Sequence, residues 1–135
     1  MAGRYGMSFA AKLIQEGKYA EAVVEASRAA ARDDEDPAPL VDRANAHAWL
    51  EQYPDAVRDF EAALALDQEA GVLELDLVDD VYFSAVLGAA KAEAPTSMAG
   101  ALATLARYAT VLPGGRHLAD ARAWADRLQA AGRGA

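Results

Sequence analysis

Small and apolar side chains recur at helical spacing in two segments that lie 34 residues apart. The strings GKYAEAVVEASRAA, residues 17–30, and EQYPDAVRDFEAAL, residues 51–64, superpose without a gap. Steps of three and four residues between the apolar positions indicate one buried face of a helix. These positions are Tyr19, Ala22, Val23, Ala26 and Ala29 in the first string, and Tyr53, Ala56, Val57, Phe60 and Ala63 in the second. The spacing therefore predicts two equivalent amphipathic helices.

A further amphipathic segment precedes each of these helices. Its buried rows are predicted to be Tyr5, Phe9 and Leu13 with Gly6, Ala10 and Ile14 in the first case, and Leu40, Ala44, His47 and Ala48 in the second. Asp36 stands before Pro37, an arrangement in which the carboxylate caps a helix that opens with proline. The pattern predicts two helical hairpins in succession.

The second helix of each hairpin opens with a string that resembles the tetratricopeptide repeat (TPR) family, whose 34-residue unit begins its second helix with G-x-Y-x-x-A. Gly17, Tyr19 and Ala22 match this string, while Glu51 replaces the glycine in the second copy. The resemblance implies repeats at residues 3–36 and 37–70. A third repeat is expected near 81–114, where Leu87-Gly88 suits the first helix and Ala101 and Leu105 suit the second.

Two segments lie outside the predicted repeats. Residues 71–80, GVLELDLVDD, interrupt the period, and we expect an irregular connector in which Asp79 or Asp80 caps the helix that follows. Residues 117–131 carry Ala121, Trp124 and Leu128 on one stripe, which predicts a C-terminal capping helix that covers the last repeat. The chain is thus expected to be one all-α domain, residues 1–135, built as a right-handed array of about three helical hairpins with a capping helix.

Composition supports helices and excludes several kinds of chemistry. Alanine, the best helix former, supplies 35 of the 135 residues. Cysteine is absent and His47 and His117 are the two histidines, so disulfides, thiol catalysis and multi-histidine metal sites are excluded. No nucleophile elbow or phosphate-binding loop is present. We therefore predict that the chain has no catalytic, metal or cofactor site. Asp33–Asp36 is expected to be a solvated acidic turn. His47 is expected to be a hydrogen-bonded ring in the core, and His117 is expected to have no partner.

Charge divides the chain into three parts. Residues 1–32 hold five basic and three acidic residues, residues 33–80 hold two and fifteen, and residues 81–135 hold six and three, giving +2, −13 and +3. The formal charge of −8 opposes binding to nucleic acid, because that affinity comes from neutralising phosphates. The acidic middle favours either steering of a basic partner or simple solubility of an alanine-rich chain.

In the TPR family the first helices of successive hairpins line a groove that takes a peptide. The resemblance places the following residues there: Arg4, Met7, Ser8, Ala11, Val41, Asp42, Asn45, Trp49, Tyr82, Val86 and Ala89. Met7, Ala11 and Asp42 stand where one subfamily has the groups that grip the terminal carboxylate of chaperone tails, so that clamp is absent. A basic or neutral segment is the expected ligand.

These observations predict a non-catalytic module that binds a peptide or helix of a partner protein. Two alternatives stay open: a structural homo-oligomer whose groove is occluded, and a regulatory accessory subunit of an enzyme. No apolar run approaches the length of about 18 to 20 residues that a membrane span needs, and no signal peptide pattern is present. A cytoplasmic protein is expected, with no nucleic-acid or membrane partner.

Overall fold

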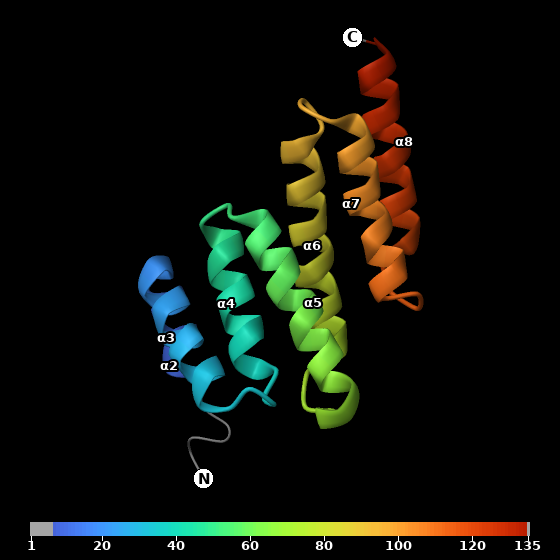
Figure 1. Cartoon of the computed structure of the whole chain (residues 1–135). Coiled ribbons are helices and arrows are strands. Elements are labelled where there is room, and N and C mark those ends of the chain that lie inside the picture. The colour runs from blue at the N-terminus through green and yellow to red at the C-terminus, as the bar shows by residue number, and fades with distance from the viewer. Residues whose placement is uncertain (1–6, 135) are drawn as a thin grey trace. The chain divides into compact units, whose positions relative to one another are not determined.

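The computed structural model describes residues 7–134, which form seven α-helices and no strand (Figure 1). The predicted all-α class is therefore confirmed. Tertiary contacts divide the chain into two compact units, residues 1–73 and 74–135, and each is described by itself. The predicted binding residue Arg4 lies outside the described residues, as do Tyr5 and Gly6.

The first unit contains two helical hairpins. Helices α2 (Phe9–Gln15) and α3 (Tyr19–Arg32) form the first, and α4 (Ala38–Trp49) and α5 (Tyr53–Ala70) form the second. Helix α4 packs against α3 as well as against its own partner α5. Leu13 of α2, Ala22 of α3 and Ala46 of α4 are buried together, and Ile14 and Val23 pack against them. Alanine at these contacts has no side chain beyond Cβ, which lets neighbouring helices approach closely.

The turns of the two hairpins have the same backbone geometry. Gly17 has φ +78°, and Glu51, which stands 34 residues later, has φ +60°. The next residues, Lys18 and Gln52, have φ/ψ of −94°/66° and −92°/65°. Because an L-residue rarely adopts a positive φ, Glu51 holds a strained conformation that the repeat geometry requires.

Two aspartates accept backbone N–H groups next to the ends of α4 and α5. The Asp36 carboxylate accepts the backbone N–H of Ala38 at 3.0 Å, as predicted for this arrangement, although the N-cap residue of α4 is Pro37 and not Asp36. After α5, Gly71 takes the left-handed conformation with φ 61°. Asp67, which is buried, then accepts the backbone N–H groups of Val72 and Leu73 at 2.7 and 3.0 Å. This carboxylate satisfies the donors of the turn that leaves α5.

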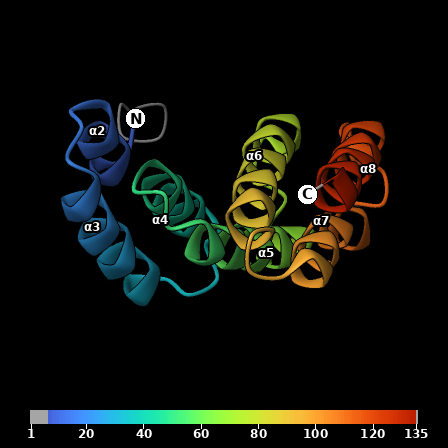
Figure 2. The ribbon, with the colours of Figure 1, turned by 90° about the horizontal axis from the view of Figure 1, so that it is seen from above.

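The second unit consists of a third hairpin and one more helix. Helices α6 (Leu75–Glu93), α7 (Met98–Val111) and α8 (Leu118–Gly134) are seen nearly end-on in Figure 2. Helix α8 packs mainly against α7, so the predicted capping helix is confirmed. Ala101, Leu105 and Tyr108 form the buried stripe of α7, at the spacing that Ala56, Phe60 and Ala63 have in α5.

The predicted irregular connector at residues 71–80 is wrong beyond its first four residues. Helix α6 begins at Leu75, with Glu74 before it as the N-cap residue. Val78 lies one helical turn before Tyr82, and both are buried, so the helical period already starts in this segment. The alternation of Leu73, Leu75 and Leu77 is not a helical pattern, and for this reason the sequence did not indicate the start of α6. Asp79 and Asp80 lie inside α6 and do not cap it.

A polar cluster joins the three helices of the second unit. The Tyr108 hydroxyl donates to the buried Asp79 carboxylate, whose other oxygen accepts the backbone N–H of Arg116 at 2.8 Å. The backbone N–H of His117 donates to the Tyr108 oxygen at 2.9 Å. Burial and the bond to Asp79 raise the pKa of Tyr108 to about 12, so the phenol keeps its proton at neutral pH.

His117, for which no partner was predicted, is held on three sides. Its ring stacks on Phe83 with centroids 4.7 Å apart, and its Nε2 and Nδ1 lie 2.7 and 3.1 Å from carboxylate oxygens of Asp80 and Asp120. The bond to Asp80 raises the pKa of His117, with Asp120 adding to it and burial opposing it, and the bond to His117 lowers the pKa of Asp80. The expectation of an unpartnered His117 is therefore wrong.

The strained turn gives a first prediction. Glu51→Gly should raise the free energy of unfolding by about 0.5–1 kcal/mol, because glycine adopts the positive φ without the steric cost of Cβ. Glu51→Ala is the matched control, since it removes the same carboxylate and keeps the strain. Thermal and urea denaturation would measure both variants. Equal stability of the two variants would contradict the strain argument.

The His117 contacts give a second prediction, on pH. Because the folded pKa of His117 is raised above its ordinary value of 6.5, its protonated form stabilises the fold below that pH, and the contribution is lost as pH rises through the folded pKa. The melting temperature of the wild type should therefore fall as pH rises above 6.5, and that of His117→Asn should fall less. Parallel slopes for the two proteins would show that the imidazole charge has no such role.

Candidate functional site

Helix α4 carries four of the eleven side chains predicted to bind a partner: Val41, Asp42, Asn45 and Trp49. Ala38, Asp42, Asn45 and Trp49 follow one another at steps of four, three and four residues, so they lie on one stripe. The stripe is about 16 Å long, at 1.5 Å per residue. Ala44 and Ala46 are fully buried on the other sides of the helix, and Val41 is half-buried next to the stripe. The helical period thus places Asp42, Asn45 and Trp49 on a single accessible row.

The start of α2 lies against this stripe. The Ser8 hydroxyl donates to Asp42 Oδ2 at 2.7 Å and also accepts the backbone N–H of Ala11 at 3.0 Å, so it caps α2 while it holds α4. Met7 precedes it and is 44% exposed. The structure therefore brings Met7, Ser8 and half-buried Ala11 together with Asp42. We call Met7, Ser8, Ala11, Val41, Asp42, Asn45 and Trp49 the α2–α4 face.

Asp42 is the one charged member of the α2–α4 face. Partial burial raises the pKa of its carboxyl, the Ser8 hydrogen bond lowers it, and the negative charge of Asp36 raises it further. No ion pair joins Asp42 to a described lysine or arginine. The carboxylate is thus a negative charge without a cation from the described part of the chain.

Trp49 supplies a large apolar surface at the end of the stripe. It is 62% exposed, yet its ring stacks on Tyr19 of α3 with centroids 5.4 Å apart and an interplanar angle of 2°. The stack orients the indole before any partner arrives, which reduces the entropy lost on binding. Sequence reasoning assigned Tyr19 to a buried row and missed this contact.

The three residues predicted from the third repeat are in the core. Tyr82 and Val86 have 0% exposure and Ala89 has 9%, and the Tyr82 ring lies 6.0 Å from that of Tyr108. Their steps of four and three residues make an apolar row, which a helix turns toward its neighbours rather than toward solvent. The structure corrects this part of the predicted site, because these side chains are not accessible to a partner.

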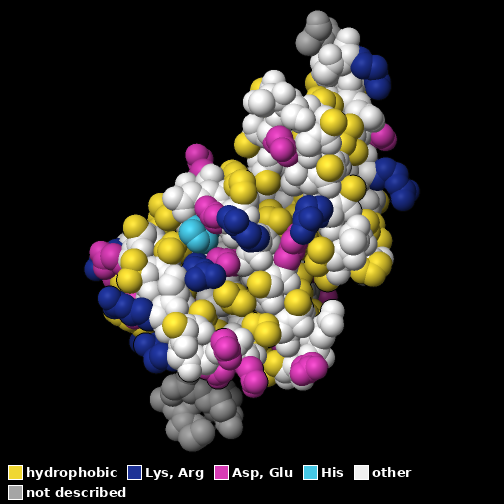
Figure 3. All heavy atoms as spheres, viewed as in Figure 1, with side chains coloured by type: hydrophobic (Ala, Val, Ile, Leu, Met, Phe, Trp, Pro, Cys, Tyr) yellow, Lys and Arg dark blue, Asp and Glu magenta, His cyan; other side chains and the backbone are white. Residues whose placement is uncertain are grey.

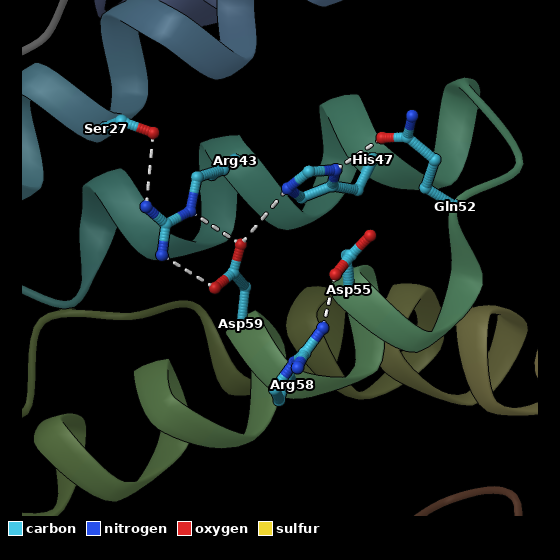
Figure 4. A network of polar contacts seen from close by, with 7 residues as sticks. All are labelled: Ser27, Arg43, His47, Gln52, Asp55, Arg58 and Asp59. Carbon is cyan, nitrogen blue, oxygen red and sulfur yellow. Dashed lines mark hydrogen bonds and ion pairs between the residues drawn. The ribbon is translucent and has the colours of Figure 1, made fainter.

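A second group of polar side chains lies between α3, α4 and α5 (Figure 4). The Arg43 guanidinium donates to both oxygens of Asp59, from Nε at 2.7 Å and Nη2 at 2.8 Å, and to Ser27 Oγ at 3.2 Å. His47 Nδ1 lies 2.7 Å from Gln52 Oε1, while its Nε2 lies 3.8 Å from Asp59. The predicted hydrogen-bonded ring of His47 is thus confirmed, although the ring is half-buried rather than fully so.

The hairpin explains this pairing. Arg43 and Asp59 lie eight residues before and after Glu51 at the turn, so the two antiparallel helices place them opposite each other. That symmetry about the turn was a signal in the sequence that we did not use. The Asp59 carboxylate holds the pKa of Arg43 above its ordinary value, with burial opposing it.

An open pocket of about 320 Å³ is lined by four members of this polar group, Ser27, Arg43, His47 and Asp59, together with Val23, Asp55 and the exposed Arg58. Arg58 also pairs with Asp55. At the centre of the space-filling view, acidic and basic side chains lie side by side, whereas acidic ones gather at the lower edge (Figure 3). Because the charges compensate one another, we assign the network to the fold. Within residues 7–133, no group of three potential ligands could hold a metal ion.

The chain was compared with known proteins. No protein-family model matches it, and no curated protein sequence is significantly similar to it. Among solved structures, it is similar to the second TPR domain of human RPAP3, determined by NMR in complex with the HSP70 peptide SGPTIEEVD. The match covers 89% of this chain and 88% of that domain, with 19% sequence identity and a TM-score of 0.56.

This chain has the fold of a TPR domain. In the TPR fold of this chain, α2/α3, α4/α5 and α6/α7 are the helical hairpins, and α8 is the additional helix. The expectation taken from Gly17, Tyr19 and Ala22 is thereby confirmed for the fold. At 19% identity the comparison carries no residue-level correspondence.

The polar network gives a third prediction. Asp59→Ala should lower the free energy of unfolding by about 2–3 kcal/mol, because it leaves the partly buried Arg43 guanidinium without its charged acceptor. Asp55→Ala is the matched control, since its ion pair with Arg58 is exposed and such pairs contribute about 0–1 kcal/mol. Chemical denaturation of both variants tests this. Similar losses in the two variants would contradict a structural role for the Arg43–Asp59 pair.

Proposed function

We propose that this TPR domain is a non-catalytic module that binds a peptide segment of a partner protein on its α2–α4 face. The observation that carries the proposal is the row of exposed Trp49 and half-buried Asn45 and Asp42, with Met7 and Ser8 beside it. Aromatic and methionine side chains are enriched where proteins bind one another, and an asparagine amide can pair with a peptide backbone. The similar domain of RPAP3 was solved with a bound peptide, which supports the same kind of ligand here.

The chemistry of the face favours a basic or neutral segment. Asp42 is its charged member among the described residues, and the segment around it, residues 33–80, has two basic and fifteen acidic residues. The RPAP3 domain was solved with SGPTIEEVD, which contains three acidic residues. Asp42, which pairs with no described lysine or arginine, would repel such a peptide. Long-range attraction would instead raise the association rate of a basic partner.

The remaining parts of the proposal concern what the chain does not do. The Ser8 hydroxyl of the α2–α4 face lies beside the Asp42 carboxylate, but its oxygen accepts the Ala11 N–H as the cap of α2, so we propose a binding module and not an enzyme, without a cofactor. The formal charge of −8 argues against nucleic acid as the partner. None of the described helices is long and apolar enough to span a membrane.

We propose the cytoplasm as the compartment of this protein. The lack of cysteine is compatible with a reducing compartment.

The fourth prediction tests the face. Asn45→Ala combined with Trp49→Ala should reduce the amount of partner protein captured from a cell lysate at least tenfold, because it removes the apolar anchor and the amide together. The matched control is Gln68→Ala with Val72→Ala, one exposed polar and one exposed apolar side chain on the α5 end of the unit. Quantitative mass spectrometry of the captured proteins gives the readout.

Stability must be checked in the same experiment. The Trp49 stack on Tyr19 contributes about 0.5–1.5 kcal/mol, so melting curves should show a folded double variant with a slightly lower midpoint. Loss of the same proteins in the Gln68/Val72 control would show a general effect. Unchanged capture by a folded Asn45/Trp49 variant would remove the α2–α4 face from the function.

A further inference from the structure

A small pocket opens beside the α2–α4 face, at the end of the first unit where α2 begins, α3 ends and α4 begins. Its volume is about 250 Å³. Small-molecule sites usually measure about 300–1,000 Å³, so this pocket suits a single side chain better than a cofactor. Ser8 and Asp42 belong both to the pocket and to the α2–α4 face, which makes the two surfaces continuous.

Half of the pocket wall is apolar. Phe9 lines it and is 62% exposed. Small side chains complete the apolar part: Ala10, Ala29, Ala38 and Pro39. A wall of this kind accommodates the methylene stem of a long side chain, and the face of an aromatic ring attracts a cation.

The polar part of the wall is negative. Three carboxylates, from Glu25, Asp36 and Asp42, face one cation, Arg32. Glu25 already pairs with Arg28 at 2.7 Å, whereas Asp36 and Asp42 accept hydrogen bonds from neutral donors, the Ala38 N–H and the Ser8 hydroxyl. No described lysine or arginine forms an ion pair with either of them.

We propose that this pocket binds a lysine or arginine side chain of the partner peptide, with its stem on Phe9 and its charge between Asp36 and Asp42. This inference rests on the proposed function, since the peptide is the ligand of the α2–α4 face, and it names the residue that the peptide must supply. Charge complementarity selects a basic side chain, and the apolar wall selects one with a long stem. The other occupants, an apolar or an acidic side chain, are outcomes of the test.

The probe is a library of random dodecapeptides displayed on phage and selected on the full chain. The selected peptides should be enriched in lysine or arginine at one aligned position. For a synthetic peptide from this set, Asp42→Asn should weaken binding about tenfold, because it removes a half-buried negative charge. Asparagine still accepts the Ser8 hydroxyl, so the variant keeps the hydrogen bond and loses the charge.

The matched variants separate charge from structure. Asp36→Asn retains the cap on Ala38 and should also weaken binding, while Asp34→Asn, in the same acidic turn but outside the pocket, should not. Replacing the aligned lysine of the peptide with glutamine should weaken binding to the wild type about tenfold and leave binding to Asp42→Asn nearly unchanged. That loss of additivity in the double-mutant cycle would place the lysine next to Asp42.

Other results would overturn the inference in distinguishable ways. Selected peptides without an aligned basic residue that still require Asn45 and Trp49 would leave the proposed function standing and refute the pocket. Equal weakening by Asp34→Asn would reduce the effect to general charge attraction and refute the pocket as well. Failure to select any peptide, together with unchanged capture by the Asn45/Trp49 variant, would refute both proposals.

Discussion

Close approach of helices through alanine is the constraint on which the first unit depends. Ala22 and Ala56 occupy equivalent positions 34 residues apart, and both are fully buried. A larger side chain at either position would push the first helix of its hairpin away and would cost packing energy over the whole contact. The close approach in turn fixes which side of α4 remains accessible. The row of Asp42, Asn45 and Trp49 is therefore a consequence of core packing.

The sequence predicted the parts of the fold that repeat. Residues 34 apart superpose in type and, as Gly17 and Glu51 show, even in backbone conformation where the residue type differs. Helix α6 was predicted too short because its first turn lies outside the period and alternates Leu75, Asp76 and Leu77, which are all exposed. A local pattern of exposed residues carries little information about a helix, and the buried apolar residue of this segment is Val78.

The candidate site could be predicted only in part, because a local sequence pattern describes one helix at a time. Helical periodicity identifies the accessible row of α4, but it does not show which side chains from other helices meet that row. The Ser8–Asp42 hydrogen bond joins residues 34 positions apart, and the Trp49–Tyr19 stack joins the end of α4 to the start of α3. Both depend on how the hairpins pack. Tyr82 and Val86 were misplaced because an apolar row was read as a binding surface.

The acidic character of residues 33–80 has two physical origins, and they have different consequences. Three of its aspartates are buried: Asp59 accepts from Arg43, Asp67 from the turn after α5, and Asp79 from Tyr108 and Arg116. The Arg43 guanidinium neutralises Asp59, while Asp67 and Asp79 accept from neutral donors in the interior, where a partner cannot contact them. Asp36 and Asp42 also accept from neutral donors, but they line a pocket at the surface and form no ion pair with a described lysine or arginine. A basic ligand that reaches this pocket would gain from contact with these two carboxylates.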